Sequence, residues 1–295
     1  MKIGYLGDVG AYSHEACMKY IESKKDSNIE TYNYKTISET ILKLDKGEID
    51  EAVVPIENSI EGGVTETIDN LLTRDKLNII DELTIEINHY LLSKCEKIEE
   101  INNIYSHPQA IAQCRNYIMN TLPNAITNEV SSTVAAARLC SINANMENKA
   151  ACISSKACQA LYGLNILAEN VNDEKNNMTK FIVISKKENG TISKASNAYL
   201  DNTQNAPHFG GVIKHNKTSI VFGTKNKPGE LYKVLGIFNA FNINLSKIES
   251  RPAKTRLGEY IFWIDFDGNK NEEKIKVLLK EVKSKATHFR ILGSY

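Results

Sequence analysis

The sequence has no excess charge of either sign and no long apolar run. Lys and Arg together number 36, as do Asp and Glu, so no net field draws the chain toward nucleic acid or an anionic membrane. No apolar run approaches the ~20 residues that a membrane span needs, and the first residues, MKIGYLGD, enter a strand directly. We therefore expect a cytoplasmic protein with neither a nucleic acid nor a membrane as its partner.

The common signatures of metal and nucleotide binding are also missing. The six cysteines are irregularly spaced, with no Cys-x-x-Cys pair and no nearby histidine cluster, which is typical of free thiols in a reducing compartment. The chain has no glycine pattern for dinucleotides or nucleotide phosphates, and no clear Ser-His-Asp or Cys-His order. These absences leave a small organic anion as the favoured ligand.

A polar trio follows a short apolar run in residues 53–63, VVPIENSIEGG. The run predicts a buried strand and residues 64–72 predict an amphipathic helix, so Glu57, Asn58 and Ser59 are expected in the turn between them. Asn and Ser at such a position often only cap a helix. In a parallel sheet, however, such a turn faces the ligand crevice.

Hydroxyl and amide side chains recur at other predicted strand-to-helix junctions. The further junctions lie in residues 7–16, 104–118, 129–140 and 150–163. Helix N-termini gathered around one crevice would offer N–H donors and partial positive charge to a carboxylate or phosphate. Because residues 84–94 read as a strand crossing between units, we expect an α/β region of two lobes, residues 1–185, with the second lobe at about 77–160.

The character of the sequence changes after this region. Thr179 and Lys180 begin its last strand, and residues 186–216, rich in Asn, Lys, Ser and Gly, predict a linker. From 217 to 295 the apolar periodicity gives the order βαββαβ, a ferredoxin-like unit.

A family resemblance covers nearly the whole chain. YLGDVGAYSHEA, VVPIENS, YSHPQAIAQC, SSTVAAA and NMTKF, followed by PGELYKVL and INLSKIESRP, resemble a monofunctional prephenate dehydratase with a C-terminal ACT regulatory domain. The resemblance implies conversion of prephenate to phenylpyruvate in phenylalanine biosynthesis. It also implies a two-lobed domain like the type II periplasmic binding proteins, and no metal or organic cofactor.

The resemblance also assigns roles to residues. Thr179 would donate to the departing ring hydroxyl. The other catalytic positions would be Glu57, Asn58, Ser106 and Gln113. The substrate would be held by helix N-termini and by Ser13, Ser59, Ser132, Thr133, Lys180 and Phe181.

Lys180 stands where the family usually has arginine. The ammonium group of lysine is a point charge, whereas the planar guanidinium of arginine can bind a carboxylate through two hydrogen bonds. The substrate preference could therefore be altered. Two alternatives stay open: an arogenate dehydratase, and a non-catalytic phenylalanine sensor.

The ACT resemblance implies L-phenylalanine as an allosteric effector, bound where modules of a homo-oligomer, dimer or tetramer, pair. Its binding residues would lie at the start of the first helix of the module and at the end of the following strand: Gly229, Glu230, Leu231, Tyr232, Glu249, Ser250, Arg251 and Pro252.

Overall fold

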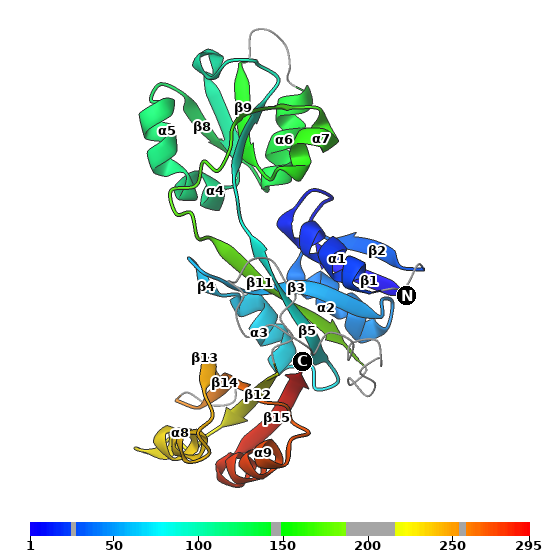
Figure 1. The fold of residues 1–295 in the computed structure, drawn as a ribbon, viewed down its shortest axis with the longest axis vertical. Coiled ribbons are helices and arrows are strands. Elements are labelled where there is room, and N and C mark those ends of the chain that lie inside the picture. Colours follow the sequence, from blue (N-terminus) through cyan, green and yellow to red (C-terminus); the bar gives the residue numbers. More distant parts are fainter. Residues whose placement is uncertain (25–27, 143–148, 187–215, 254–257) are drawn as a thin grey trace, which may run out of the picture.

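The computed structural model describes residues 1–24, 28–142, 149–186, 216–253 and 258–295. Three sheets organise these residues, one in each of two lobes and one in a C-terminal domain. In Figure 1 the second lobe lies at the top, the first lobe in the middle and the C-terminal domain below it. The predicted linker falls almost wholly outside the described residues.

The first lobe is built on a mixed sheet in the order β2-β1-β3-β11-β5, with β4 added to β3. Strand β1 is parallel to β2 and β3, whereas β11 runs antiparallel to β3 and β5. Its elements are β1 (Lys2–Leu6), α1 (Tyr12–Ser23), β2 (Glu30–Tyr34), α2 (Ile37–Lys46), β3 (Glu51–Asn58), β4 (Gly62–Gly63), α3 (Thr65–Leu72), β5 (Asn78–Glu86) and β11 (Met178–Ser185).

Both faces of this sheet are buried, because apolar residues of either parity line its central strands. Val53 packs with α1 residues on one face, while Val54 packs with α2 and α3 residues on the other. The pattern accounts for the continuous apolar run that predicted the strand.

The second lobe has its own mixed sheet, in the order β10-β6-β9-β7-β8. Because β5 pairs with β11 in the first sheet, this lobe spans about residues 90–168 rather than the expected 77–160. Two crossings join the lobes, from β5 to β6 and from β10 to β11 (Figure 1). Its elements are β6 (Tyr90–Ser93), the 3-10 helix η1 (Ile98–Glu100), β7 (Asn103–Ser106), α4 (Pro108–Gln113), α5 (Arg115–Thr121), β8 (Ile126–Glu129), α6 (Thr133–Ile142), β9 (Ala150–Ser154), α7 (Ala157–Tyr162) and β10 (Asn165–Ala168).

The C-terminal domain has the predicted βαββαβ order, with strands arranged β13-β14-β12-β15 and all neighbours antiparallel. Phe222, Phe238 and Leu278 belong to the core between its sheet and its helices. Its elements are β12 (Lys217–Gly223), α8 (Glu230–Ala240), β13 (Leu245–Pro252), β14 (Tyr260–Asp267), α9 (Glu273–Lys285) and β15 (His288–Ser294).

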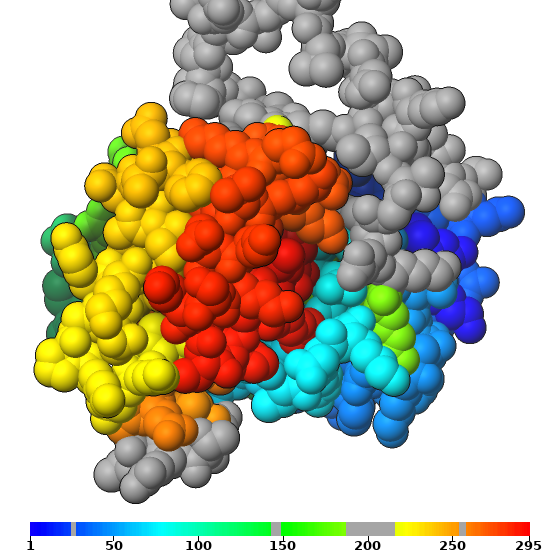
Figure 2. Space-filling model, turned by 90° about the horizontal axis from the view of Figure 1, so that it is seen from below, coloured from blue at the N-terminus to red at the C-terminus, as the bar shows by residue number. Residues whose placement is uncertain are grey.

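The other face of that sheet is packed against the first lobe, a contact we call the seam. Trp263 and Leu292 share one buried core with Leu71 and Ile79 of the first lobe. A Cβ on Gly293 would lie 2.0 Å from the carbonyl oxygen of Ile79, so only glycine permits this approach of β15 to β5. In Figure 2 the red C-terminal surface adjoins the cyan surface of the first lobe.

Charged groups border the apolar centre of the seam. The contacts include Arg251 Nε to Asp69 Oδ1 at 3.0 Å, Lys217 Nζ to Glu82 Oε1 at 2.5 Å, and Arg290 Nη1 to Leu71 O at 2.9 Å. Arg290 also donates to the carbonyl oxygen of Leu77. The domains are therefore joined by a desolvated surface as well as by the chain.

Candidate functional site

Thr179 and Asn58 face one another on neighbouring strands, at the end of β3 nearest the second lobe. Asn58 lies opposite Thr179 in the register of β3 and β11, so it belongs to a strand and not to the turn that we expected. Pairing with β11 keeps β3 extended through Asn58, and the turn to β4 follows at residues 59–61. The Nδ2 of Asn58 donates to Thr179 Oγ1 at 2.9 Å.

The orientation of the Asn58 amide is fixed by the backbone. Its Oδ1 accepts from the N–H groups of Ile60 and Glu61, both at 3.0 Å. Since a backbone N–H can only donate, the other end of the amide must be the NH₂ group that faces Thr179. The hydroxyl oxygen of Thr179 therefore accepts a hydrogen bond, and its own proton is available for donation.

A chain of side-chain contacts continues from this pair into the second lobe, and we call it the interlobe network. Asn58 Nδ2 also donates to Asn177 Oδ1 at 2.8 Å, and Asn177 Nδ2 donates to Gln113 Oε1, on α4, at 3.0 Å. His89 Nε2 lies 3.2 Å from the same Gln113 oxygen. Thr179, Asn58 and Gln113, three of the predicted catalytic residues, are thus brought together.

Sequence reasoning missed two members of this network. Asn177 and His89 are only 2% and 3% exposed. Burial lowers the pKa of His89 and outweighs the opposing effect of its contact with Gln113, so the imidazole is neutral near pH 7. The signal for Asn177 was its place in NMTKF, two residues before Thr179; His89 had only its position in the crossing between lobes.

Lys180 points away from this network. Side chains alternate along β11, so Thr179 shares a face with Phe181, in the core beside α1, while Lys180 shares the other with Ile182, in the core at the seam. An extra residue in β3 brings Glu57 to the Lys180 side, where Lys180 Nζ lies 3.5 Å from Glu57 Oε2.

The carboxyl of Glu57 is surrounded by cations. Burial raises its pKa, but the ammonium groups of Lys247 and Lys180 more than offset that effect, so the pKa falls below its usual value. Glu57 is therefore ionised at neutral pH, and it faces the C-terminal domain rather than Thr179.

The predicted serines hold the backbone together. Ser106 is fully buried and donates to Ile153 O at 2.6 Å. Ser59 Oγ accepts from the N–H of Met178 at 2.9 Å, which pins the turn after β3 to β11. Ser132 Oγ accepts from Ala135 N at 2.9 Å, as a residue capping α6 does.

The remaining predicted substrate contacts are placed as follows. Ser13 is buried in α1, and Phe181 is buried in the sheet core. Thr133 is the first residue of α6, and its carbonyl accepts from Ser154 Oγ at 2.9 Å. Helix α1 begins after Ala11, which offers no side-chain cap to the first N–H groups of the helix.

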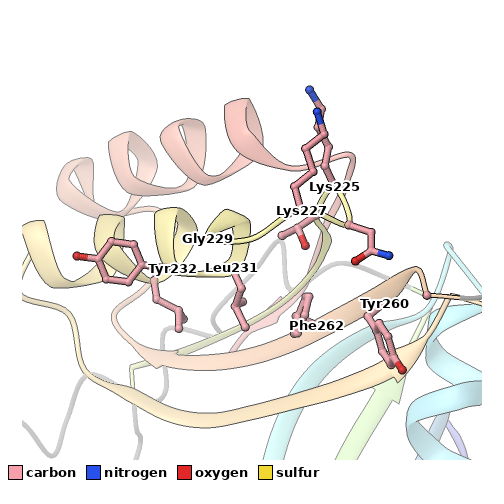
Figure 3. A pocket seen from close by; sticks show the side chains of 11 residues that line it. Lys225, Lys227, Gly229, Leu231, Tyr232, Tyr260 and Phe262 are labelled. Carbon is pink, nitrogen blue, oxygen red and sulfur yellow. The ribbon is translucent and has the colours of Figure 1, made fainter.

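A pocket of about 400 Å³ lies in the C-terminal domain. Figure 3 shows Leu231 on α8 with Phe262 and Tyr260 on β14 along it. Gly229 also lines it and immediately precedes α8 with φ of 81°, a left-handed conformation that glycine adopts without strain.

Three of the eight predicted effector residues line this pocket: Gly229, Leu231 and Tyr232. The others lie elsewhere: Glu230 pairs with Lys233, Glu249 and Arg251 point to the seam, and Ser250 and Pro252 are exposed on β13. The lining residues that the prediction lacked include Lys225, Lys227, Tyr260 and Phe262.

Neither a metal site nor a membrane-spanning helix is found within the described ranges. No group of three or more His, Cys, Asp or Glu side chains there could hold a metal ion. No helix in the same ranges is both long and apolar enough to cross a membrane.

Comparison with known proteins places the chain in a family. The family model described as prephenate dehydratase matches residues 3–189, more than half of the chain. The chain belongs to the prephenate dehydratase family. A second model, the ACT domain, matches residues 218–283, so the C-terminal domain is an ACT domain, as predicted.

Relatives and solved structures agree with this assignment over the full length. The chain is 38% identical to the prephenate dehydratase of Methanocaldococcus jannaschii over 97% of this chain and 94% of that protein. It is 33% identical to the prephenate dehydratase of Bacillus subtilis over 100% of this chain and 98% of that protein. A solved prephenate dehydratase from Arthrobacter aurescens, in complex with L-Phe, is 30% identical, with a TM-score of 0.80 and coverage of 100% and 89%.

Proposed function

We propose that this chain converts prephenate to phenylpyruvate, releasing carbon dioxide and water, and that L-phenylalanine regulates it through the ACT domain. The observation that carries the proposal is the Asn58–Thr179 hydrogen bond at the head of the interlobe network. Family membership supplies the reaction class.

Thr179 is the donor to the departing ring hydroxyl in this proposal. Aromatisation of the ring favours loss of the carboxyl group, so the barrier lies in expelling the hydroxyl, which needs a hydrogen-bond or proton donor. Asn58 donates to Thr179 Oγ1, which orients the threonine proton outward and polarises its O–H bond. The substrate carboxylates would bind at helix N-termini, including that of α1.

Gln113 ties the two lobes together in the same proposal. It lies at the end of α4 in the second lobe and contacts both Asn177 and His89. Closure of the lobes on prephenate would therefore affect the position of Thr179, because the network reaches Thr179 through Asn177 and Asn58.

The test is Thr179→Ala, with Thr179→Ser as the matched control that keeps the hydroxyl. Loss of one such donor typically costs ~10²–10³-fold in kcat, while prephenate binding should stay nearly unchanged. Phenylpyruvate formation and calorimetric binding measure the two effects. A Thr179→Ala enzyme whose kcat stays within about threefold of wild type removes Thr179 from the mechanism.

The two alternatives are separated by direct assays. An arogenate dehydratase would show the higher kcat/KM on arogenate, the amino analogue of prephenate, when both substrates are compared. A non-catalytic sensor would bind phenylalanine yet form no phenylpyruvate.

For regulation, the proposal places phenylalanine at the ACT pocket, in a homo-oligomer formed through ACT domains. Strand β13 is an edge of its sheet and exposes Ile248, and Tyr232 on α8 is 78% exposed. An unpaired edge beside apolar side chains favours association with a second copy. Molecular mass in solution, measured with and without phenylalanine, tests this part.

A further inference from the structure

A group of opposite charges at the seam joins the ACT domain to the dehydratase site, and we call it the seam cluster: Glu57, Lys180, Lys247 and Glu249. Lys247 Nζ lies 3.4 Å from Glu57 Oε2 and 3.4 Å from Glu249 Oε2. The Lys247 side chain is only 9% exposed, whereas that of Glu57 is 36% exposed.

Lys247 comes from a strand that is fixed on one side of it. Alternation along β13 turns Lys247, Glu249 and Arg251 toward the first lobe. Arg251 pairs with Asp69, and the Glu249 carboxylate packs so close to Gly63 that a Cβ there would lie 2.4 Å from Oε2. The part of β13 that follows Lys247 is therefore held against the first lobe, and the Lys247 side chain is almost fully buried there.

Glu57, the partner of Lys247, is the neighbour in sequence of Asn58, which orients the proposed proton donor Thr179. Glu57 precedes Asn58 on β3, and β4 pairs with both: Glu57 lies opposite Gly63 and Asn58 opposite Gly62. The contacts of β13 thus meet the same hairpin twice, at Glu57 and at Gly63. A shift of this hairpin moves the amide that orients Thr179.

We propose that Lys247 of the ACT domain is a positioning residue for the dehydratase site, acting through Glu57 on Asn58. It holds the carboxylate of a half-buried residue whose remaining cation, Lys180, is 3.5 Å away. The inference rests on the proposed function for its kinetic consequence, though not for the contact itself.

The charges around Glu57 determine whether its pKa rises or falls when one of them is removed. The charged groups that face Glu57 are Lys180 from β11 and Lys247 from β13, with Glu249 behind Lys247. Removing the Lys247 charge raises the pKa of Glu57, because burial then opposes only one ammonium group. Neutralising Glu249 acts in the opposite direction, since Lys247 is then shared with no other carboxylate.

The experiment compares Lys247→Met, Lys247→Arg and Lys276→Met. Lys276 is the matched control, a lysine of the ACT domain that pairs with Glu273 on α9. Lys247→Met should lower kcat about tenfold with little change in KM, between the effects of exposed and buried ion pairs. The acidic limb of its kcat/KM profile should move to higher pH. Lys247→Arg should restore most of the activity, and Lys276→Met should behave as wild type.

A second pair of measurements keeps the inference testable if Lys247→Met folds poorly or the wild type lacks dehydratase activity. Carbon-13 NMR follows the titration of the Glu57 carboxyl directly, with Glu57→Gln to assign the signal. Its pKa should rise in Lys247→Met and fall in Glu249→Gln. Inactivity of the wild type on both prephenate and arogenate refutes the proposed function alone. An unchanged Glu57 titration in both variants, or a folded Lys247→Met enzyme with wild-type kcat, overturns the role of Lys247.

Discussion

Replacing Asn177 by alanine is expected to lower kcat/KM for prephenate about thirtyfold. The side chain is 2% exposed and makes two hydrogen bonds, to Asn58 at 2.8 Å and to Gln113 at 3.0 Å. Each such bond contributes about 1 kcal/mol net, and about 2 kcal/mol corresponds to a factor of about thirty.

The expected loss is no larger than about thirtyfold because neither hydrogen-bond partner of Asn177 is left without a contact. Asn58 Nδ2 keeps Thr179, and Gln113 Oε1 keeps His89. The larger penalty for an orphaned buried group therefore does not apply. What is lost is the connection that Asn177 makes between Asn58 and Gln113, and so between the lobes.

The assay is steady-state formation of phenylpyruvate, with thermal unfolding to confirm that each variant is folded. Asn177→Asp can still accept from Asn58 but sets a buried carboxylate oxygen against the Gln113 oxygen, so it should be at least as impaired as Asn177→Ala. Asn165→Ala is the control, since the Asn165 side chain donates to Cys95 O on the surface of the second lobe, away from the interlobe network. A folded Asn177→Ala enzyme within about threefold of wild type would refute the positional role of the network.

Other expected outcomes concern Lys180, the effector pocket and the thiols. Lys180→Met should change KM for prephenate little, because the Lys180 ammonium pairs with Glu57 on the face away from Thr179; a sharp rise in KM would show that Lys180 reaches the substrate carboxylate. Gly229→Val should abolish phenylalanine inhibition and spare uninhibited turnover, because a β-branched residue resists φ of 81°; persistent inhibition in a folded, active variant places the effector elsewhere. Burial raises the pKa of the Cys17 thiol to about 12, so it stays protonated and unreactive at pH 8. A thiol reagent should modify half-buried Cys95 first, and Cys95→Ser should remove that phase.

Local sequence patterns predicted the elements well where apolar periodicity was strong. The βαββαβ order after residue 217 is confirmed, as is Pro108 in the first turn of a helix. Glu57 and Asn58 were placed wrongly in a turn, because polarity suggested an end to the strand while β11, more than a hundred residues later in the chain, extends it.

The sequence could have predicted in part that the proposed site residues lie on two opposite faces of the first-lobe sheet. Once Thr179 and Lys180 are assigned to a strand, alternation alone sends their side chains in opposite directions. The contact between Glu57 and Lys247 has no such signal, because 190 residues separate the two and only the packing of the ACT domain brings them together. The roles of His89 and Asn177 likewise could not be predicted from local sequence, because their contacts with Gln113 form only when the two lobes come together.

The seam also determines how the chain should denature. Leu292 and Trp263 share a core with Leu71 and Ile79, so loosening either domain exposes apolar surface on the other. Domains with small polar contacts melt separately, whereas a large desolvated contact couples their unfolding. Heating should therefore produce one transition for the first lobe and the ACT domain together. A chain cut after Ser185 should aggregate rather than persist as an unregulated enzyme, because the face that β15 covers would be left in water.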